Sequence, residues 1–211
     1  MTPDKASRES ITIVDYGMGN LGSIQNMLKK IGVESLISAD PHLISLSKKI
    51  ILPGVGHFKK GMENIRAQVD LLQALNNVAL GKQIPVLGIC LGAQLVTSFS
   101  EEGDIEGLNW IPARTKRFNA ASHLKVPHMG WKKVAITRPH PLVKDLADSS
   151  RFYFVHSYYM VPEDPSHTLL MTTYGEDFAA ALQRDNIMAC QFHPEKSHRF
   201  GMKILKNFSE L

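Results

Sequence analysis

The sequence predicts an α/β fold in which a central, mostly parallel sheet is flanked by helices. Through the first half of the chain, short apolar runs typical of buried strands alternate with segments whose apolar residues recur at helical spacing. Glycine-rich loops follow three of these apolar runs, and parallel sheets bind their ligands at the carboxyl ends of strands. After Glu101, short strand candidates separated by turn residues predominate. We therefore expect extra antiparallel strands in the second half.

The bulk composition is typical of one globular domain. The 211 residues, of which 44% are hydrophobic and 21% charged, suffice for a single core. We place this domain over residues 11–211, after a flexible lead-in at residues 1–10. No apolar run approaches the roughly 20 residues of a membrane span, and the first ten residues lack a secretory signal. The net charge of +4 comes from scattered residues, so neither a membrane nor a nucleic acid is expected as a partner.

The cysteines and the first loop argue against bound metals and cofactors. Cys90 and Cys190 form no disulfide framework and have no metal-ligand spacing. A reducing, cytoplasmic location is the natural interpretation. The loop YGMGN contains G-x-G but lacks the third glycine of a dinucleotide-binding fingerprint. We expect no metal site and no cofactor.

The first strand is predicted at Ile11–Asp15, before the YGMGN loop. A helix follows, because Leu21, Ile24, Leu28 and Ile31 recur at helical spacing, and Gly32 is placed to end it. Two further strands are predicted at residues 33–37 and 49–52, and residues 62–80 are expected to be mostly helical, in two pieces.

The strand at residues 49–52 ends in the sequence PGVG, at residues 53–56. Two glycines so close together permit unusual backbone angles and expose amides, which can hold an anion. A plain turn explains the same four residues.

The chain is organised around the stretch from Ile84 to Thr97. The predicted strand Ile84–Ile89 runs into Cys90, which is flanked by Gly88 and Gly92 and followed by helical spacing. A G-x-C-x-G between a strand and a helix is typical of a nucleophile elbow. The helix N-terminus favours a thiolate and a developing oxyanion. A buried structural cysteine fits the spacing equally well.

The second half is predicted to be rich in short strands. Asp185 and Asn186 are expected to turn a hairpin between the last two strands, and Met202, Leu205 and Phe208 form the apolar face of a closing helix. The strand candidates are residues 110–111, 117–118, 131–136, 151–155, 168–174, 178–183 and 187–192.

A base and its orienting partner are available where the last predicted strand ends. His193 and Glu195 flank Pro194, so the imidazole can move a proton while the carboxylate fixes its tautomer. With nine histidines in the chain, one H-x-E is weak support by itself. His128 and His156 lie in aromatic-rich stretches and are interpreted as structural or adjacent to substrate.

These motifs together resemble a known family. GICLGAQL with QFHPEKS resembles the class I, triad-type glutamine amidotransferases, which have a flavodoxin-like fold. DYGMGNLGSI, ILPGVGHF, KVPHMGWKKV, FYFVHSYY and LKNF resemble, more narrowly, the glutaminase subunits of imidazole glycerol phosphate synthases, from histidine biosynthesis. The resemblance extends from Ile11 to Phe208. It implies hydrolysis of L-glutamine to glutamate and ammonia.

The resemblance also implies roles for individual residues. Cys90 would be the nucleophile, His193 the base and Glu195 its orienting partner. The backbone N–H groups of Leu91 and Val55 would stabilise the oxyanion. The residues implied to lie near the glutamine are Gly54, Gly56, Gln94 and Ser157.

A protein partner is implied as well, because ammonia must reach a second site under shelter. In the family this partner is a (β/α)8 cyclase subunit, forming a heterodimer, that makes imidazole glycerol phosphate and aminoimidazole carboxamide ribotide. Lys196 would pair with a partner carboxylate and Tyr153 would gate ammonia, although a solvated lysine and half-buried aromatics explain the same positions. The residues implied to face the partner are Met18, Trp131, Tyr153 and Lys196.

Two positions depart from the family pattern. Ala93 stands where a Met is usual, which is expected to loosen packing beside the site, and His198 stands where Gln or Gly is frequent. The segments EEGDIEGLNWIPARTKRF and KVPHMGW also resemble a paralogous branch, whose members supply ammonia for amidination of a bacterial surface-polysaccharide sugar. The glutaminase reaction is the same in both branches, and only the pathway differs.

Overall fold

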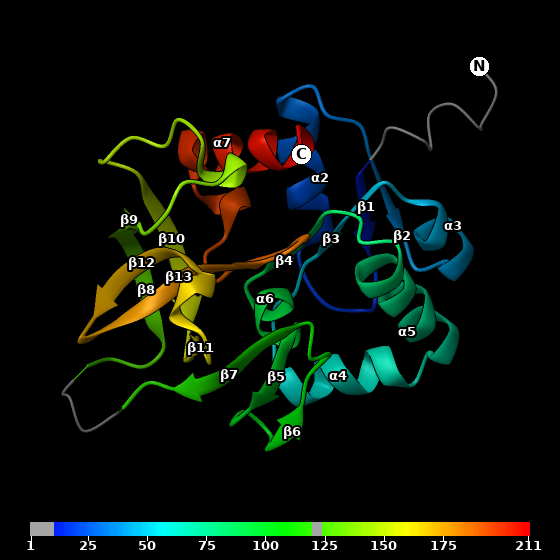
Figure 1. Ribbon diagram of the computed structural model, residues 1–211, viewed down its shortest axis with the longest axis horizontal. Coiled ribbons are helices and arrows are strands. Elements are labelled where there is room, and N and C mark those ends of the chain that lie inside the picture. Colours follow the sequence, from blue (N-terminus) through cyan, green and yellow to red (C-terminus); the bar gives the residue numbers. More distant parts are fainter. Residues whose placement is uncertain (1–10, 120–123) are drawn as a thin grey trace.

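The computed structural model describes residues 11–119 and 124–211, so the predicted lead-in at residues 1–10 lies outside the described residues. A twelve-stranded mixed sheet runs through the molecule, and a separate pair of antiparallel strands, β8 and β10, packs beside it (Figure 1). The strands of the large sheet lie in the order β2-β1-β3-β4-β14-β13-β11-β7-β5-β6, with β12 also paired to β13 and β9 paired to β12. The expected α/β class with additional antiparallel strands is confirmed.

The elements follow one another as strands and helices in the first half and mostly as strands in the second. The strands are β1 (Ile11–Val14), β2 (Ser35–Ser38), β3 (Lys49–Leu52), β4 (Val86–Ile89), β5 (Thr97–Ser100), β6 (Ile105–Glu106), β7 (Ile111–Arg117), β8 (His128–Lys133), β9 (Ala135–Ile136), β10 (Arg151–His156), β11 (Tyr158–Pro162), β12 (Thr168–Tyr174), β13 (Glu176–Arg184) and β14 (Ile187–Cys190). The helices are α2 (Leu21–Lys30), α3 (Pro41–Leu46), α4 (Phe58–Arg66), α5 (Val69–Asn76), α6 (Leu91–Leu95) and α7 (His198–Ser209), with short helical turns η1 (Asn77–Gly81), η3 (Pro141–Val143), η4 (Pro165–His167) and η5 (Pro194–Lys196).

Helices cover both faces of the parallel strands, and each face has its own core. Successive side chains of a strand point to opposite faces, so Ile11 and Ile13 of β1 join the core under α2 and α7, whereas Val14 joins the core under α3, α4 and α5. Figure 1 shows α2 beside α7, away from α3 and α5. Burial on both faces explains why these strands appear in the sequence as uninterrupted apolar runs.

The topology brings two distant segments to one edge of the sheet. β4 pairs in parallel with β3 on one side and with β14 on the other. Ile89 of β4 is level with Cys190 of β14, so the loops that follow these strands emerge side by side. The PGVG loop after β3 emerges next to them, as expected for the carboxyl edge of a parallel sheet.

Several predicted boundaries differ from the observed ones. The predicted strand at residues 84–89 begins at Val86, and the one at residues 187–192 ends at Cys190. The candidates at residues 110–111 and 117–118 overlap the two ends of the single strand β7, which excludes Trp110 and Phe118, and residues 131–136 divide between β8 and β9. The hairpin at Asp185 and Asn186 is confirmed, because β13 and β14 pair antiparallel across it. Within the described residues, no helix is long and apolar enough to span a membrane.

Candidate active site

Cys90 occupies a strained turn between β4 and α6. Its φ of 53° is unusual for a residue with a side chain, and its N–H donates to the carbonyl of Cys190, 2.8 Å away. A Cβ on Gly92 would lie 1.8 Å from the carbonyl oxygen of Leu52, and one on Gly88 would lie 2.8 Å from the backbone of Ala93. Both glycines are therefore required by the close approach of neighbouring backbone, which explains the G-x-C-x-G spacing.

His193 is buried where β14 runs into η5, and its ring is held at one nitrogen. Nδ1 lies 2.7 Å from Oε1 of Glu195, and the side chains of His193 and Glu195 are 1% and 2% exposed. The backbone N–H of His193 donates to the carbonyl of Tyr153 at 2.9 Å, and Ser197 Oγ donates to the His193 carbonyl at 2.6 Å. These bonds leave Nε2 as the nitrogen available to Cys90.

The surroundings of His193 favour its protonated form. Burial by itself lowers the pKa of the imidazole, but the hydrogen bonds and charges of Cys90 and Glu195 outweigh burial and raise the pKa to about 10. A positively charged imidazole beside a sulfur is the arrangement that stabilises a thiolate, the nucleophilic form of cysteine.

A pocket of about 210 Å³ opens over Cys90 and His193. Of the residues predicted from sequence, the structure brings together here Val55, Gly56, Cys90, Leu91, Gln94, Ser157 and His193. Gly54 does not line the pocket but packs behind it, where a Cβ would lie 2.8 Å from Cβ of Leu91. Sequence reasoning did not single out several further lining residues, namely Glu102, Pro127, Val155 and Tyr158.

The PGVG loop sits directly against the start of α6. The backbone N–H of Leu91, expected to face an oxyanion, donates instead to the carbonyl of Gly54 at 3.3 Å. The hydroxyl of Tyr16 donates to the carbonyl of Pro53 at 2.6 Å. Burial, with the charge of Cys90 as a smaller cause, raises the pKa of Tyr16, so its hydroxyl keeps the proton that it donates.

Gln94 contributes its side chain to the inner wall of the pocket. Its amide nitrogen donates to the carbonyl of Tyr158 at 2.9 Å and to Oε1 of Gln191 at 3.1 Å. Gln94 is 4% exposed and Gln191 is fully buried. The polar wall is therefore held by buried hydrogen bonds, whose loss would leave unsatisfied groups.

Two buried histidines support the same wall. Nδ1 of His156 lies 2.7 Å from the carbonyl of Tyr158, and Nε2 of His156 lies 3.1 Å from Nδ1 of His128. Because a carbonyl only accepts, Nδ1–H of His156 donates to it, and Nδ1–H of His128 donates to Nε2 of His156. Burial lowers the pKa of His128 to about 4 and that of His156 to about 3, so both rings are neutral at neutral pH. The aromatic neighbours in the sequence were the only signal for this pair.

A model of the class-I glutamine amidotransferases matches residues 12–210. The chain belongs to this family. The amidotransferase chain is 50% identical over 198 residues to "Imidazole glycerol phosphate synthase subunit HisH 2" of Methanococcus maripaludis, covering 94% of this chain and 98% of the relative. It is 48% identical to the protein of the same name from Pseudomonas aeruginosa, over 95% of this chain and 99% of the relative.

Solved structures support the fold at lower identity. A structure of PurLQS from Thermotoga maritima superimposes with a TM-score of 0.74 at 16% identity, covering 96% of this chain and 98% of that one. A crystal structure of a glutamine amidotransferase gives a TM-score of 0.71 at 16% identity, covering 94% of this chain and 97% of that one.

The residues expected to face a partner of this amidotransferase chain lie in two places. Met18 lies against the PGVG loop, since a Cβ on Gly56 would be 2.6 Å from Met18 Cε. Trp131 and Tyr153 lie together on β8 and β10, with ring centroids 6.1 Å apart, and Nζ of Lys196 lies 5.9 Å from the Tyr153 ring. Three of the four therefore share one surface.

The two departures from the family pattern have different structural settings. Ala93 is fully buried within α6, against the core under α4 and α5. His198 has a φ of 46°, a backbone conformation that glycine adopts at no cost, and its ring stacks parallel to Trp131 with centroids 5.5 Å apart. The aromatic stacking is a contact that neither Gln nor Gly would make.

Proposed function

We propose that this chain is the glutamine-hydrolysing subunit of an imidazole glycerol phosphate synthase, which supplies ammonia for histidine biosynthesis. The names of near-full-length relatives support this pathway and do not favour the surface-polysaccharide alternative. The observation that carries the chemistry is His193, held by Glu195 at 2.7 Å with its other nitrogen free for Cys90.

In the first step, the Cys90 thiolate attacks the side-chain amide carbon of L-glutamine. The new S–C bond pushes the carbonyl electrons onto oxygen, and backbone N–H groups stabilise this oxyanion. When the oxyanion collapses, the C–N bond breaks and the His193 imidazolium gives its proton to the departing nitrogen. Ammonia and a glutamyl thioester on Cys90 are the products of this step.

In the second step, water replaces ammonia. His193, now neutral, accepts a proton from the water as its oxygen attacks the thioester carbon. The S–C bond breaks, glutamate leaves, and the Cys90 thiolate and the His193 imidazolium are restored. Glu195 orients the ring and stabilises its positive charge in both steps, while Gln94 and Ser157 bind the glutamine, with Gly54 and Gly56 beside it.

The PGVG loop supplies a means of control. With the Leu91 N–H donated to the Gly54 carbonyl, that donor does not face the oxyanion. Rotation of the loop would release the Leu91 N–H and turn the N–H of Val55 toward the substrate. A partner that favours the rotated state would switch on hydrolysis by a population shift. The isolated chain should therefore hydrolyse glutamine far more slowly than the complex.

The partner in this proposal is a (β/α)8 cyclase subunit that receives ammonia through a heterodimer interface. Ammonia released into neutral water is mostly protonated and lost, so a sheltered transfer conserves glutamine. Cys90 and Cys190 are free thiols, which supports function in the reducing cytoplasm.

The decisive experiment is rescue of a histidine auxotroph that lacks its own glutaminase subunit. We expect the chain to restore growth and its Cys90→Ser variant to fail, while the matched variant Cys190→Ala restores it. With purified cyclase, Cys90→Ser should lose the glutamine-dependent reaction and keep the reaction driven by ammonium salts. Failure of the unmodified chain to rescue growth, or to serve the cyclase, would contradict the proposal.

A further inference from the structure

The paired strands β8 and β10 expose one continuous face, which we call the ribbon face. It is built from three directly opposed cross-strand pairs: Met129 with Val155, Trp131 with Tyr153, and Lys133 with Arg151. The alternate side chains of β10, Phe152, Phe154 and His156, are buried. Met129 and Trp131 are 62% and 39% exposed.

The ribbon face changes character along its length. Its apolar end adjoins the catalytic pocket, because the carbonyl of Val155 lies 3.9 Å from the sulfur of Cys90. The aromatic pair Trp131 and Tyr153 forms the middle, and Lys133 and Arg151 form the cationic end. A protein partner that covers the apolar end of the ribbon face, next to the pocket, therefore also contacts the cationic end.

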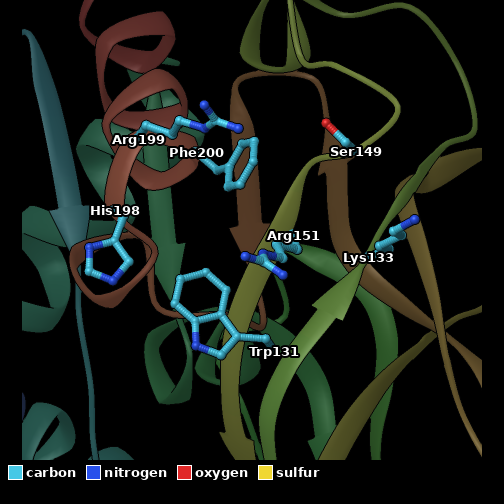
Figure 2. Close-up of a pocket in the computed structure, with 7 residues that line it drawn as sticks. All are labelled: Trp131, Lys133, Ser149, Arg151, His198, Arg199 and Phe200. Atoms are coloured by element: carbon cyan, nitrogen blue, oxygen red, sulfur yellow. The ribbon is translucent and has the colours of Figure 1, made fainter.

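The cationic end opens into a cleft of about 670 Å³ between the ribbon and α7. Figure 2 shows the side chains that line this basic cleft, with Trp131 lying beside His198 and with Arg199 reaching in from α7. The guanidinium of Arg151 lies 5.7 Å from the Trp131 ring centre. The lining residues are Trp131, Lys133, Ser149, Arg151, His198, Arg199 and Phe200.

The charges of this cleft are not compensated within the described chain. Lys133 and Arg151 stand directly opposite each other, and like charges at such positions destabilise a sheet. Arg199 adds a third cation, and the structure gives none of the three an ion pair with a carboxylate among the described residues. The lining contains no Asp or Glu. All three side chains are exposed, and an anion bound in the cleft would relieve their mutual repulsion.

We propose that the basic cleft, which continues the surface where Trp131, Tyr153 and Lys196 are expected to face the cyclase, holds an acidic segment of that partner. Arginine binds carboxylates through paired hydrogen bonds, and aromatic and Arg residues dominate the binding energy of interfaces. A free phosphate would occupy the cleft but leave Met129 and Trp131 exposed. Continuity with the pocket therefore favours a protein. This inference rests on the proposed function, because the partner is the one proposed there.

The test is the salt dependence of association. The rate constant for binding of the purified cyclase subunit is measured by surface plasmon resonance at 50 and 500 mM NaCl. The test variant is Lys133→Gln/Arg151→Gln/Arg199→Gln. The matched control, Lys29→Gln/Lys30→Gln/Lys48→Gln, removes the same charge from exposed positions at the opposite, amino edge of the sheet.

Long-range steering raises association rates at low salt and is screened at high salt. In the low-salt buffer we expect the test variant to associate about tenfold or more slowly than the unmodified chain. At high salt the association rate constants of the two proteins should converge. The control should associate at the same rate as the unmodified chain in both buffers. A second variant, Lys133→Glu, places a carboxylate opposite Arg151 instead of a like charge. It should therefore raise the melting temperature of the isolated chain. It should still slow association with the cyclase.

The outcomes separate the two proposals. If the unmodified chain binds the cyclase and the test variant binds at the same rate with the same salt dependence, the docking role of the cleft is overturned. The same conclusion follows if inorganic phosphate saturably quenches Trp131 emission while all variants bind the cyclase alike, since the cleft would then serve a free anion. If the unmodified chain does not bind the cyclase at all, the proposed function itself fails.

Discussion

Glu195 Oε1 lies 2.7 Å from Nδ1 of His193, although Pro194 alone separates the two residues in the chain. The turn η5, in which Pro194 is the first residue, brings the carboxylate back toward the imidazole. Both side chains are almost completely buried, so the carboxylate acts in a region of low dielectric, where its charge has the greatest effect on the ring.

Glu195→Gln should therefore reduce the rate of glutamine hydrolysis by roughly 10²- to 10⁴-fold, the usual contribution of a positioned acid–base group. The neutral amide neither stabilises the imidazolium nor fixes the tautomer in the same way. Steady-state kinetics with the partner present should show the loss in kcat rather than KM. The exposed matched variant Glu34→Gln should retain full activity, and an active Glu195→Gln enzyme would remove Glu195 from the mechanism.

Alkylation should distinguish the two cysteines. Cys190 is fully buried, and burial raises the pKa of its thiol, so it stays unreactive in the folded chain. Cys90 lines the pocket and faces His193. Iodoacetamide should add one equivalent to the native protein and none to Cys90→Ser, as read by mass spectrometry. Labelling of Cys190 in the folded Cys90→Ser variant would contradict the structure.

Two Gly→Ala substitutions should have opposite effects on stability. At Gly54 a Cβ would lie 2.4 Å from the Tyr16 hydroxyl oxygen and 2.8 Å from Cβ of Leu91, so Gly54→Ala should destabilise the chain by about 1–3 kcal/mol. At Gly22, within α2, a Cβ meets nothing within 4 Å, and Gly22→Ala should stabilise by about 0.5–1 kcal/mol. Urea unfolding measures the free energy of unfolding of both variants. If the two substitutions changed it equally, the packing behind the pocket would be loose.

The free energy of unfolding should be greatest near neutral pH. The pKa values of His128 and His156 are lowered in the folded chain to about 4 and about 3, so the unfolded chain binds more protons below about pH 6.5 and stability falls as the pH drops toward 4. The pKa of His193 is raised to about 10, so the folded chain binds more protons above about pH 6.5. Stability therefore also falls as the pH rises toward 10.

Substitution separates these two arms. His193→Gln should remove the loss of stability toward high pH and keep the loss toward low pH. His42→Gln, at an exposed position of α3, should change neither. Urea midpoints between pH 4.5 and 9 provide the measurement. An alkaline arm that persists in His193→Gln would mean that other groups produce it.

The sequence predicted the parts of the site that depend on local geometry. The spacing of Gly88, Cys90 and Gly92 reflects close backbone contacts, so the elbow could be recognised from three residues. His193 and Glu195 were recognised for the same reason, because η5 alone brings them together. The hairpin at residues 185–186 was likewise a local feature.

Features that depend on distant pairing escaped prediction. The strand β5 has the polar sequence TSFS, and its parallel pairing with β7, not its own periodicity, makes it a strand. The bond between Gln94 and Gln191 joins residues that are 97 positions apart. His128 and His156 are likewise joined across the two strands of the ribbon. Neighbouring residues give no signature of the first two contacts, and for the histidine pair they give only an aromatic-rich setting.

The position of β14 has a consequence for how the chain folds during its synthesis. β14 lies between β4 and β13. One edge of β4 therefore stays unpaired until about a hundred further residues have been synthesised. Unpaired apolar edges invite aggregation. The late strand that closes this gap also delivers His193. Under the proposed mechanism, a ribosome-bound chain therefore holds Cys90 without its base, and the ability to cleave an amide arises together with the completed central sheet.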